Sequence, residues 1–442
     1  MGEASTALFT DRYELTMVDA ALRDGTAGRR CVFELFTRRL SGARRFGVVA
    51  GTGRLLQLLR EFRFGDDQLR YLRDGRVVDA DTVRYLEDFR FTGSITGYRE
   101  GELYFPGSPV LTVEGTFAEA VVLETIALSV MNYDSAVATA AARMSIAAGD
   151  RPLAEMGSRR TGEHSAVAAA RAAFIAGFDA TSNLEAGRVW GIPTMGTAAH
   201  AFTLLHDTEA DAFRSQVAAL GAATTLLVDT YDIRAGVEAA VRAAGTGLGG
   251  VRIDSGDLPS VAAAVRDQLD ELGATGTRIT VTSDLDEYAI ATLAAAPVDA
   301  YGVGTSLVTG SGTATAGMVY KLVARQAGDG SWVSVAKASA DKASRGGRKA
   351  AFRTLDAGTA TQELIAVADG FETTPAGAAF PDARALQQPL IVAGEADPQY
   401  EGIAGVQTAR AHHARVREEL PVRALALSRA DPAIPTVYVD VE

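Results

Sequence analysis

The segments TLLVDTYDIRAGVEAAVRAAG (225–245) and GVRIDSGDLPSVAAAVRDQLDELG (250–273) decide the fold. Each begins with a short apolar run, typical of a buried strand, and continues with apolar residues at helical spacing. The same order of strand and helix recurs from about residue 150 to about residue 310. Strands and helices that alternate over short connections form a parallel sheet covered by helices. Seven such units predict an irregular (β/α) barrel rather than an open sheet, and the lack of a G-x-G-x-x-G turn after the first strand of a nucleotide-binding half weakens the Rossmann alternative.

The regions on either side of this pattern differ from it. Residues 1–125 mix helix and strand patterns, which predicts an N-terminal α/β domain. Residues 126–315 carry the barrel. A helical stretch at 117–149 spans the start of this region, and we expect it to break near Asn132–Asp134. Residues 316–442 are rich in strand patterns and too short for a second barrel. We therefore predict that they complete the N-terminal domain as an accessory domain of an α/β protein and end in a helical extension.

Composition excludes several classes of function. Of the 442 residues, 43 are basic and 55 are acidic, giving a net charge of −12. Nucleic-acid binding needs clustered cations, so nucleic acid is not expected as the main partner. No apolar run reaches the length of about 18 residues that a membrane span needs. The single cysteine, Cys31, cannot form an internal disulfide, which favours a reducing, cytoplasmic compartment.

The four lysines of the chain fall in one short window. Lys321, Lys337, Lys342 and Lys349 stand in a chain that otherwise uses arginine as its cation. A lysine ammonium is a compact charge that arginine does not replace at every site. The window is therefore either a phosphate contact, for instance to ATP, or an ordinary solvated loop.

Polar side chains follow nearly every strand of the predicted barrel. In such barrels the chemistry occurs at the carboxyl ends of the strands. Each of these residues, taken alone, is also a good helix N-cap. The candidates in chain order are Arg159, Arg160, Asn183, Thr197, His200, Asp229, Arg252, Asp254, Asp257, Gly304 and Thr305.

These residues share a chemical theme. Arg159, Arg160 and Arg252 can grip phosphate or carboxylate groups through paired N–H donors. The turn at Gly304–Thr305 offers backbone N–H groups near a late strand, where barrels often bind phosphate. Carboxylates at Asp229, Asp254 and Asp257 suit ribose hydroxyls or Mg²⁺. The combination indicates a phosphorylated sugar together with a metal ion.

His200 is the candidate nucleophile. It lies in the first turn of a predicted helix whose N-cap we expect to be Thr197. A helix N-terminus disfavours imidazolium, and a neutral imidazole can accept a phosphoryl group. The alternative is a structural histidine bonded to nearby backbone. His412 and His413 are weaker candidates, because we expect them on the exposed face of a late helix.

The motifs of the chain, taken in order, resemble the nicotinate phosphoribosyltransferase family. They are TDRYELTM (10–17), EMGSRRTGEHSAVAAARAAFIAGFDATSN (155–183), IPTMGTAAHAF (192–202), VDTYD (228–232), RIDSGD (252–257) and YGVGTSL (301–307). The resemblance runs from about residue 8 to at least residue 355. It implies a type II phosphoribosyltransferase fold. It also implies that nicotinate and 5-phosphoribosyl 1-diphosphate give nicotinate mononucleotide, with ATP hydrolysis coupled through a phosphohistidine.

The resemblance also implies roles for individual residues. His200 matches the phosphohistidine, while Thr197 and Arg252 match the nicotinate contacts. Thr305 with Gly304 matches the sugar-phosphate contact. Arg159 and Asp254 would hold the diphosphate donor and its Mg²⁺. Tyr13 matches an aromatic residue that reaches the site from the other subunit, so a homodimer with shared active sites is expected.

Two positions depart from the family pattern. Met156 stands where relatives usually have an aromatic residue that stacks on the base, although a thioether can also cover a ring face. Ala201 follows the histidine where a serine is usual, which removes one hydroxyl. Both differences put the fine geometry of the site in question rather than the reaction.

Other activities remain as alternatives. The related nicotinamide enzyme has an aspartate where this chain has Asn183; a carboxylate there would repel nicotinate, so Asn183 favours the acid. The quinolinate enzyme needs further cations for a second carboxylate. A silent binding protein on the same scaffold should have lost His200 or Arg252. A Schiff-base aldolase needs a barrel lysine, and none precedes Lys321.

Overall fold

The computed structural model describes residues 5–336, 345–368, 380 and 382–441. The chain divides into two compact units, each described here by itself. Unit 1 comprises residues 1–139 and 313–442, and unit 2 comprises residues 140–312. The first division falls inside the long helix α6 (Glu124–Ala148).

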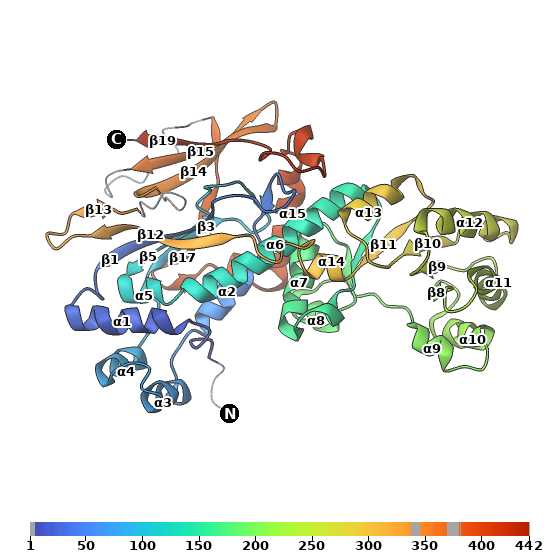
Figure 1. Cartoon of the computed structure of the whole chain (residues 1–442), viewed down its shortest axis with the longest axis horizontal. Coiled ribbons are helices and arrows are strands. Elements are labelled where there is room, and N and C mark those ends of the chain that lie inside the picture. The colour runs from blue at the N-terminus through green and yellow to red at the C-terminus, as the bar shows by residue number, and fades with distance from the viewer. Residues whose placement is uncertain (1–4, 337–344, 369–379, 381, 442) are drawn as a thin grey trace. The chain divides into compact units, whose positions relative to one another are not determined.

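A parallel sheet forms the centre of unit 2. Its strand order is β7-β6-β11-β10-β9-β8, and helices α10, α11 and α12 lie beside β8, β9 and β10 (Figure 1). The strands are β6 (Leu153–Glu155), β7 (Ala180–Thr181), β8 (Thr225–Leu227), β9 (Gly250–Ile253), β10 (Arg278–Val281) and β11 (Ala300–Val303). The α-helices are α7 (Glu163–Ile175), α8 (Leu184–Trp190), α9 (His200–Leu204), α10 (Glu209–Leu220), α11 (Ile233–Ala244), α12 (Leu258–Glu271), α13 (Glu287–Thr292) and α14 (Thr305–Val308).

The strand and helix patterns of residues 225–273 account for the centre of this sheet. Val251 and Ile253 of β9, with Ile279 and Val281 of β10, are fully buried, as strands covered by helices require. The following helices begin where predicted. Asp232 caps α11 by accepting a 2.8 Å hydrogen bond from the Ala235 N–H. The alternation of strand and helix predicted for residues 225–296 is therefore confirmed.

The predicted barrel is only half formed. The sheet is curled, and β7 and β8 are its two ends in the part of the chain that the structure describes. The strand expected at residues 192–196 is reduced to a single bridge between Thr194 and Thr181. Pro193 has no N–H to donate to a ladder, and Gly196 weakens strand structure, which explains why pairing does not extend.

The long helical stretch is interrupted earlier than predicted. Helix α5 (Phe117–Val121) ends at Val121 with Val122 as its C-cap, and α6 then continues unbroken through residues 132–134. By length and hydropathy Phe117–Ala148 would suffice to cross a membrane, but 67% of its most apolar window is buried inside the structure. Ala136, Ala138 and Ala140 are fully buried, as expected of a core helix.

Unit 1 joins strands from both halves of the chain. Its main sheet has the order β13-β12-β1-β5-β3-β17-β18, a second sheet has the order β16-β14-β15-β19, and β2 pairs with β4. The C-terminal strand β12 pairs with β1, and β17 pairs with β3. The strands are β1 (Arg30–Thr37), β2 (Gly47–Val48), β3 (Ser94–Tyr98), β4 (Leu103–Tyr104), β5 (Leu111–Thr116), β12 (Met318–Gln326), β13 (Trp332–Ser334), β14 (Arg348–Asp356), β15 (Thr359–Ala368), β16 (Ala383–Ala385), β17 (Gln387–Val392), β18 (Glu395–Ala396) and β19 (Thr436–Val441).

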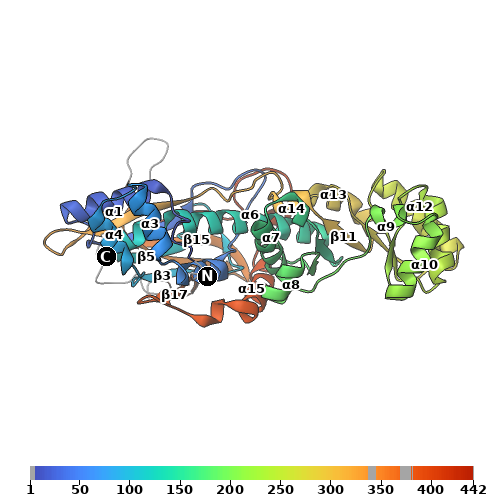
Figure 2. The same ribbon diagram turned by 90° about the horizontal axis from the view of Figure 1, so that it is seen from below.

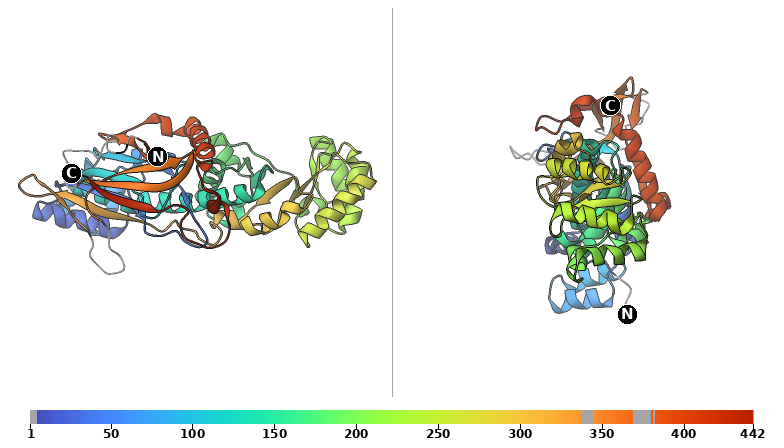
Figure 3. Two further views of the ribbon diagram at one scale, coloured as in Figure 1. Left: turned by 90° about the horizontal axis from the view of Figure 1, so that it is seen from above. Right: turned by 90° about the vertical axis from the view of Figure 1, so that its right-hand side faces the viewer.

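Helices cover the sheets of unit 1. They are α1 (Arg12–Asp24), α2 (Thr52–Arg60), α3 (Asp66–Asp74), α4 (Ala80–Glu87) and α15 (Gly402–Arg417), together with α5 and the start of α6. Helices α1, α3 and α4 form one group, visible in Figure 2. Strand β19 lies beside β15 in the second sheet, as the red and orange strands of Figure 3 show.

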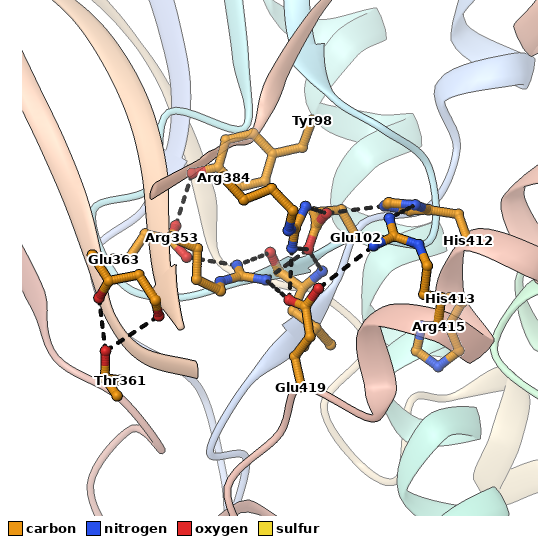
Figure 4. A network of polar contacts seen from close by, with 12 residues as sticks. Tyr98, Glu102, Arg353, Thr361, Glu363, Arg384, His412, His413, Arg415 and Glu419 are labelled. Atoms are coloured by element: carbon orange, nitrogen blue, oxygen red, sulfur yellow. Dashed lines mark hydrogen bonds and ion pairs between the residues drawn. The ribbon is translucent and has the colours of Figure 1, made fainter. Parts of the chain in front are cut away.

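A buried polar network links these parts of unit 1 (Figure 4). Arg353 forms ion pairs of 2.7 Å with both Glu102 and Glu363. Burial alone would raise the pKa of Glu102, but Arg353, His412 and Arg384 outweigh it and hold that pKa well below its usual value. The network therefore consists of charges that are paired, as buried charges must be.

His412 and His413 belong to this buried region, so the expectation that they lie on an exposed helix face is wrong. His412 Nε2 lies 2.9 Å from Glu102 Oε2, and His413 Nδ1 lies 2.9 Å from the Gly101 carbonyl oxygen. Burial lowers the pKa of His413 to about 4. Helical spacing alone does not show that another chain segment covers this face of α15.

The lysine window is split by the structure. Lys349 is buried and forms a 2.7 Å ion pair with Glu34, so its charge serves the interior of unit 1. Lys321 donates to its neighbour's carbonyl, Tyr320 O, at 2.6 Å and lies 3.9 Å from Glu124. Lys337 and Lys342 lie outside the described residues. Because the Lys349 ammonium is paired with the buried Glu34 carboxylate, it is not available to bind a phosphate.

Candidate active site

A cavity of about 330 Å³ lies at the carboxyl ends of neighbouring strands of unit 2. The strands that contribute are β6, β11, β10 and β9, which are adjacent in the sheet. The cavity is lined by Met156, Arg159, Arg160, Arg252, Asp254, Thr282, Ser283, Asp284, Gly302, Gly304 and Thr305. Of the candidates at this edge, Arg159, Arg160, Arg252, Asp254 and Thr305 line the cavity, and Gly304 contributes its backbone.

Arg252 is the half-buried cation of this cavity. It projects from β9, and its Nη1 donates a 2.8 Å hydrogen bond to the Thr197 hydroxyl. Its Nε is buried and has no hydrogen-bond partner in the described part of the chain. Burial lowers the pKa of Arg252, and the nearby Asp254 and Asp229 oppose that shift. An arginine with an unsatisfied buried donor can receive an anionic group, and carboxylates suit its planar fork.

His200 lies next to two carboxylates that follow β8 and β9. Its Nε2 is 4.0 Å from Asp229 Oδ1 and 3.9 Å from Asp254 Oδ2. Its side chain is 40% exposed, so a ligand can reach the ring. Helix α9 begins at His200 with Ala199 as its N-cap, so the prediction that Thr197 caps this helix is wrong. The Thr197 hydroxyl instead accepts from Arg252.

The two carboxylates are themselves held in place. Asp229 Oδ2 accepts 2.8 Å hydrogen bonds from the Asp254 N–H and the Ser255 hydroxyl. Asp254 Oδ1 accepts a 2.7 Å hydrogen bond from the Thr282 hydroxyl. Asp229 Oδ1 is buried and has no hydrogen-bond partner among the residues that the structure describes. This orphaned oxygen, on the His200 side, is available to a donor or a cation.

A complete metal centre is not preformed. No group of three or more His, Cys, Asp or Glu side chains that could hold a metal occurs within the described residues. Mg²⁺ usually takes one or two protein carboxylates and completes its shell with water and substrate phosphates. The pair Asp229 and Asp254 fits that requirement. Asp257 lies at the start of α12 and accepts from the Ser260 hydroxyl.

Glycines allow the two sides of the cavity to approach closely. A Cβ on Gly302 would lie 2.7 Å from the Met156 sulfur, so Met156 rests against this part of β11. A Cβ on Gly157 would lie 2.9 Å from the Gly304 carbonyl oxygen. The turn after β6 and the turn after β11 therefore pack backbone to backbone, with Met156 forming part of the cavity wall.

Three predicted site residues have other surroundings in the structure. Asn183 caps α8: its Oδ1 accepts from the Ala186 N–H at 2.9 Å, and its Nδ2 donates to the Ser158 hydroxyl at 3.0 Å. Asp257 does not line the cavity. Tyr13 belongs to unit 1 and is 46% exposed there. Burial is the larger cause, and the nearby Glu124 carboxylate the second, of a pKa of Tyr13 that is raised to about 12.

Two residues of the site were not singled out from the sequence: Thr282 lines the cavity, and Thr230 contacts the His200 ring. Ser283 and Asp284, which also line the cavity, were expected after strand β10 but were given no role. Ser283 has a φ of +114°, which is unusual for a residue other than glycine and is typical of functional turns. The position of Thr282 directly after β10, and of Thr230 in the turn after β8, is the signal that could have found these two residues.

Known proteins resemble this chain over most of its length. Residues 8–132 match the family model described as the nicotinate phosphoribosyltransferase (NAPRTase) N-terminal domain. The Mycobacterium tuberculosis nicotinate phosphoribosyltransferase pncB1 is 56% identical, covering 97% of this chain and 94% of that protein. The Bacillus subtilis nicotinate phosphoribosyltransferase is 40% identical, over 80% of this chain and 74% of that protein.

Solved structures share the fold. The crystal structure of human nicotinic acid phosphoribosyltransferase superposes with a TM-score of 0.80 at 26% identity, covering 97% of each chain. A nicotinate-nucleotide pyrophosphorylase from Pyrococcus furiosus superposes with a TM-score of 0.76 at 23% identity, covering 95% of this chain and 97% of that chain.

Proposed function

This chain belongs to the nicotinate phosphoribosyltransferase family, and from that membership we propose how its site performs the family's reaction. The protein is a nicotinate phosphoribosyltransferase of NAD biosynthesis. It joins nicotinate to 5-phosphoribosyl 1-diphosphate, giving nicotinate mononucleotide and diphosphate. ATP hydrolysis is coupled to this reaction through a phosphohistidine. The observation that carries the assignment of the site is the cavity lined by Arg252, whose Nε has no hydrogen-bond partner among the described residues, and by Asp254, which lies 3.9 Å from His200 Nε2.

We propose that Arg252 and Thr197 bind the nicotinate carboxylate. The Arg252 Nε has no hydrogen-bond partner among the described residues, and Nη1 is already aligned by Thr197, so a carboxylate can complete the set of hydrogen bonds. Met156 then covers a face of the pyridine ring from the β6 side. A neutral carboxamide would accept weaker hydrogen bonds from the guanidinium than a carboxylate does, which favours the acid over nicotinamide.

The ribosyl donor would occupy the other side of the cavity. Arg159 offers paired N–H donors for a phosphate, and the backbone at Gly304 and Thr305 offers further donors. Departure of diphosphate leaves positive character on the ribose carbon, which the carboxylate of Asp254 stabilises. Because Asp254 is itself fixed by Thr282, its charge needs little rearrangement during the reaction.

Mg²⁺ would be held by Asp229 and Asp254, with Asp257 as a more distant candidate. When bound, it supplies positive charge that neutralises the phosphate oxygens of the leaving group. The orphaned Asp229 oxygen supports this assignment. The remaining positions of its coordination shell would come from water and substrate phosphates.

His200 would accept the γ-phosphoryl group of ATP. Its ring is accessible, and the carboxylates beside Nε2 stabilise the positive charge that develops on the imidazole as the new bond forms. Loss of that phosphoryl group to water after the transfer reaction then completes the coupling to ATP.

We also propose a cytoplasmic homodimer in which Tyr13 completes the partner's site. The exposed position of Tyr13 supports this role. Mixing the variants Tyr13→Ala and Arg252→Ala tests it at a nicotinate concentration so low that each variant alone has little activity, since a shared site then restores about a quarter of wild-type activity when the dimers exchange subunits at random. Absence of any restored activity, with subunit exchange verified, would count against the shared site.

Product analysis tests the function directly. The purified protein is mixed with nicotinate, 5-phosphoribosyl 1-diphosphate, ATP and Mg²⁺, and a parallel reaction receives nicotinamide. We expect nicotinate mononucleotide, diphosphate and ADP from the first mixture and little product from the second. A preference for the amide would instead favour nicotinamide phosphoribosyltransferase, the alternative, for which Asn183 is the residue to examine.

A further inference from the structure

The carboxylate of Glu155 is buried directly behind the wall of the cavity. Glu155 is the last residue of β6 and has no exposed surface, while its neighbour Met156 lines the cavity. Burial raises the pKa of Glu155, and hydrogen bonds from Thr181 and Gly157 oppose that rise. No cation forms an ion pair with this carboxylate within the described part of the chain. Burying a carboxylate costs free energy unless its oxygens are hydrogen-bonded, so its two partners account for its presence.

Both partners of Glu155 are hydrogen-bond donors. The Gly157 N–H donates to Oε1, and the Thr181 hydroxyl donates to Oε2 at 2.5 Å. The Thr181 oxygen itself accepts from the Asn183 N–H at 2.9 Å, so the hydroxyl hydrogen is left to be donated to Glu155. Two donors need two acceptor oxygens, which a carboxylate supplies and a carboxamide does not.

These bonds tie the turn after β6 to the segment at the end of β7. The turn is held at Gly157 by the buried carboxylate, and it is held at Ser158 by Asn183 Nδ2, which donates to the serine hydroxyl at 3.0 Å. Met156 precedes these two anchored residues and Arg159 follows them, and both line the cavity. The carboxylate therefore fixes the stretch of backbone that carries two of the side chains of the cavity wall.

We propose that Glu155 is a positioning residue whose carboxylate fixes this turn, so that Met156 covers the pyridine ring and Arg159 faces the phosphates of the ribosyl donor. This inference rests on the proposed function, because it assumes that both substrates bind in this cavity. Glu155 has no exposed surface, so it acts through the turn and not on a substrate. A wall that is ordered in advance reduces the cost of ordering it when a substrate binds, and the benefit is expressed in KM.

The test compares Glu155→Gln, which keeps the shape but turns one acceptor into a donor, with Thr181→Val, which removes the hydroxyl facing Oε2. Thr181→Ser keeps that hydroxyl. The matched control is Asp299→Asn, just before β11 and so at the other end of the sheet. Its carboxylate accepts from the Ile279 N–H at 2.7 Å, a bond that an amide oxygen can replace. Steady-state kinetics gives kcat and the KM for nicotinate and for 5-phosphoribosyl 1-diphosphate, and urea denaturation gives the stability of each variant.

We expect Glu155→Gln and Thr181→Val to raise the KM for both substrates by about tenfold, because each variant breaks a hydrogen bond to a charged group. The kcat at saturating substrate should change by less than about threefold, since the interaction removed aids binding throughout the reaction. Thr181→Ser and Asp299→Asn should keep the wild-type values.

A carboxylate with a purely structural role would behave differently. Its loss would lower the urea midpoint and the amount of active enzyme, but the molecules that still fold would keep the wild-type KM values, and that result would overturn the proposal. If Glu155→Gln does not fold, the KM values of Thr181→Val decide in the same way. A wild-type protein that forms no nicotinate mononucleotide would refute the proposed function, and the role of Glu155 with it, whereas an active wild type with unchanged KM values in both variants would refute the role alone.

Discussion

Arg252 and Thr197 stand 55 positions apart in the sequence, yet Arg252 Nη1 donates a 2.8 Å hydrogen bond to the Thr197 hydroxyl. This bond fixes one end of the guanidinium and leaves the buried Nε without a partner among the described residues. The arrangement is poised for a carboxylate, because an anion would satisfy a donor that the protein itself leaves open.

Replacing Arg252 by alanine should raise the KM for nicotinate far more than the KM for ATP. Hydrogen bonds to charged groups contribute about 1.5–3 kcal/mol, so the expected rise is about 10- to 150-fold. Steady-state kinetics with each substrate varied in turn measures it. Arg278→Ala, an exposed arginine at the start of β10, is the control. Equal effects on nicotinate and ATP would contradict the carboxylate role.

Replacing His200 by alanine should separate the two activities. We expect transfer of the ribosyl group to persist at high substrate concentration while ATP hydrolysis in step with product disappears, because the phosphoryl acceptor is missing. ADP and nicotinate mononucleotide are quantified in the same reactions. His206→Ala removes a histidine from the segment just after α9 as a control. ATP hydrolysis that still tracks product in His200→Ala would show that another residue carries the phosphate.

Replacing Gly302 by alanine should weaken nicotinate binding. The new methyl group would lie 2.7 Å from the Met156 sulfur and 2.6 Å from the Thr282 methyl carbon, so Met156 must shift from the cavity wall. Overpacking of this kind costs about 1–3 kcal/mol. We expect a higher KM for nicotinate and a lower denaturation midpoint. Gly276→Ala, where an added Cβ meets nothing within 4 Å, should change neither value.

Replacing Lys349 by methionine should destabilise unit 1 without a specific effect on substrate binding. The change leaves the buried Glu34 carboxylate without its cation, which costs about 3–5 kcal/mol. Burial already raises the pKa of Glu34, and Lys349 opposes that shift. Urea denaturation measures the loss, with the more exposed Lys321→Met as control. The double variant Glu34→Gln/Lys349→Met should recover part of it. A stable Lys349→Met protein with a raised KM for ATP would instead support phosphate contact.

The buried His413 should make the protein less stable in mild acid. Its pKa is about 4 in the folded state, below the usual 6.5, so the unfolded chain takes up a proton first as the pH falls. The contribution is intact above about pH 6.5 and is lost progressively toward pH 4, by about 3 kcal/mol in total.

The variant His413→Asn tests this dependence, because its amide can still donate to the Gly101 carbonyl but cannot titrate. Urea unfolding between pH 4 and pH 7 should show a flatter slope than wild type. His206→Asn, which alters a histidine outside the interior, should keep the wild-type slope. Parallel curves for His413→Asn and wild type would contradict the prediction.

Local patterns along the chain were sufficient to predict much of unit 2. Apolar runs and helical spacing predicted β8 to β10 and α11 to α13, since these periods depend only on near neighbours. The same pattern placed Arg252, Asp254 and Thr305 at strand ends, and parallel strands bring such ends to one edge. The activity followed from the order of the motifs.

Tertiary packing decided the features that depend on distant segments. It turned Thr197 toward Arg252 instead of the α9 N-terminus, engaged Asn183 as the α8 cap, and stopped the sheet at a half-barrel. It also buried Lys349 and His413, and it set Thr230 beside one nitrogen of His200. The spacing of residues along the chain indicates which of them share a face of one helix or strand. Whether two distant side chains touch depends on how separate elements pack, which is a property of the whole fold.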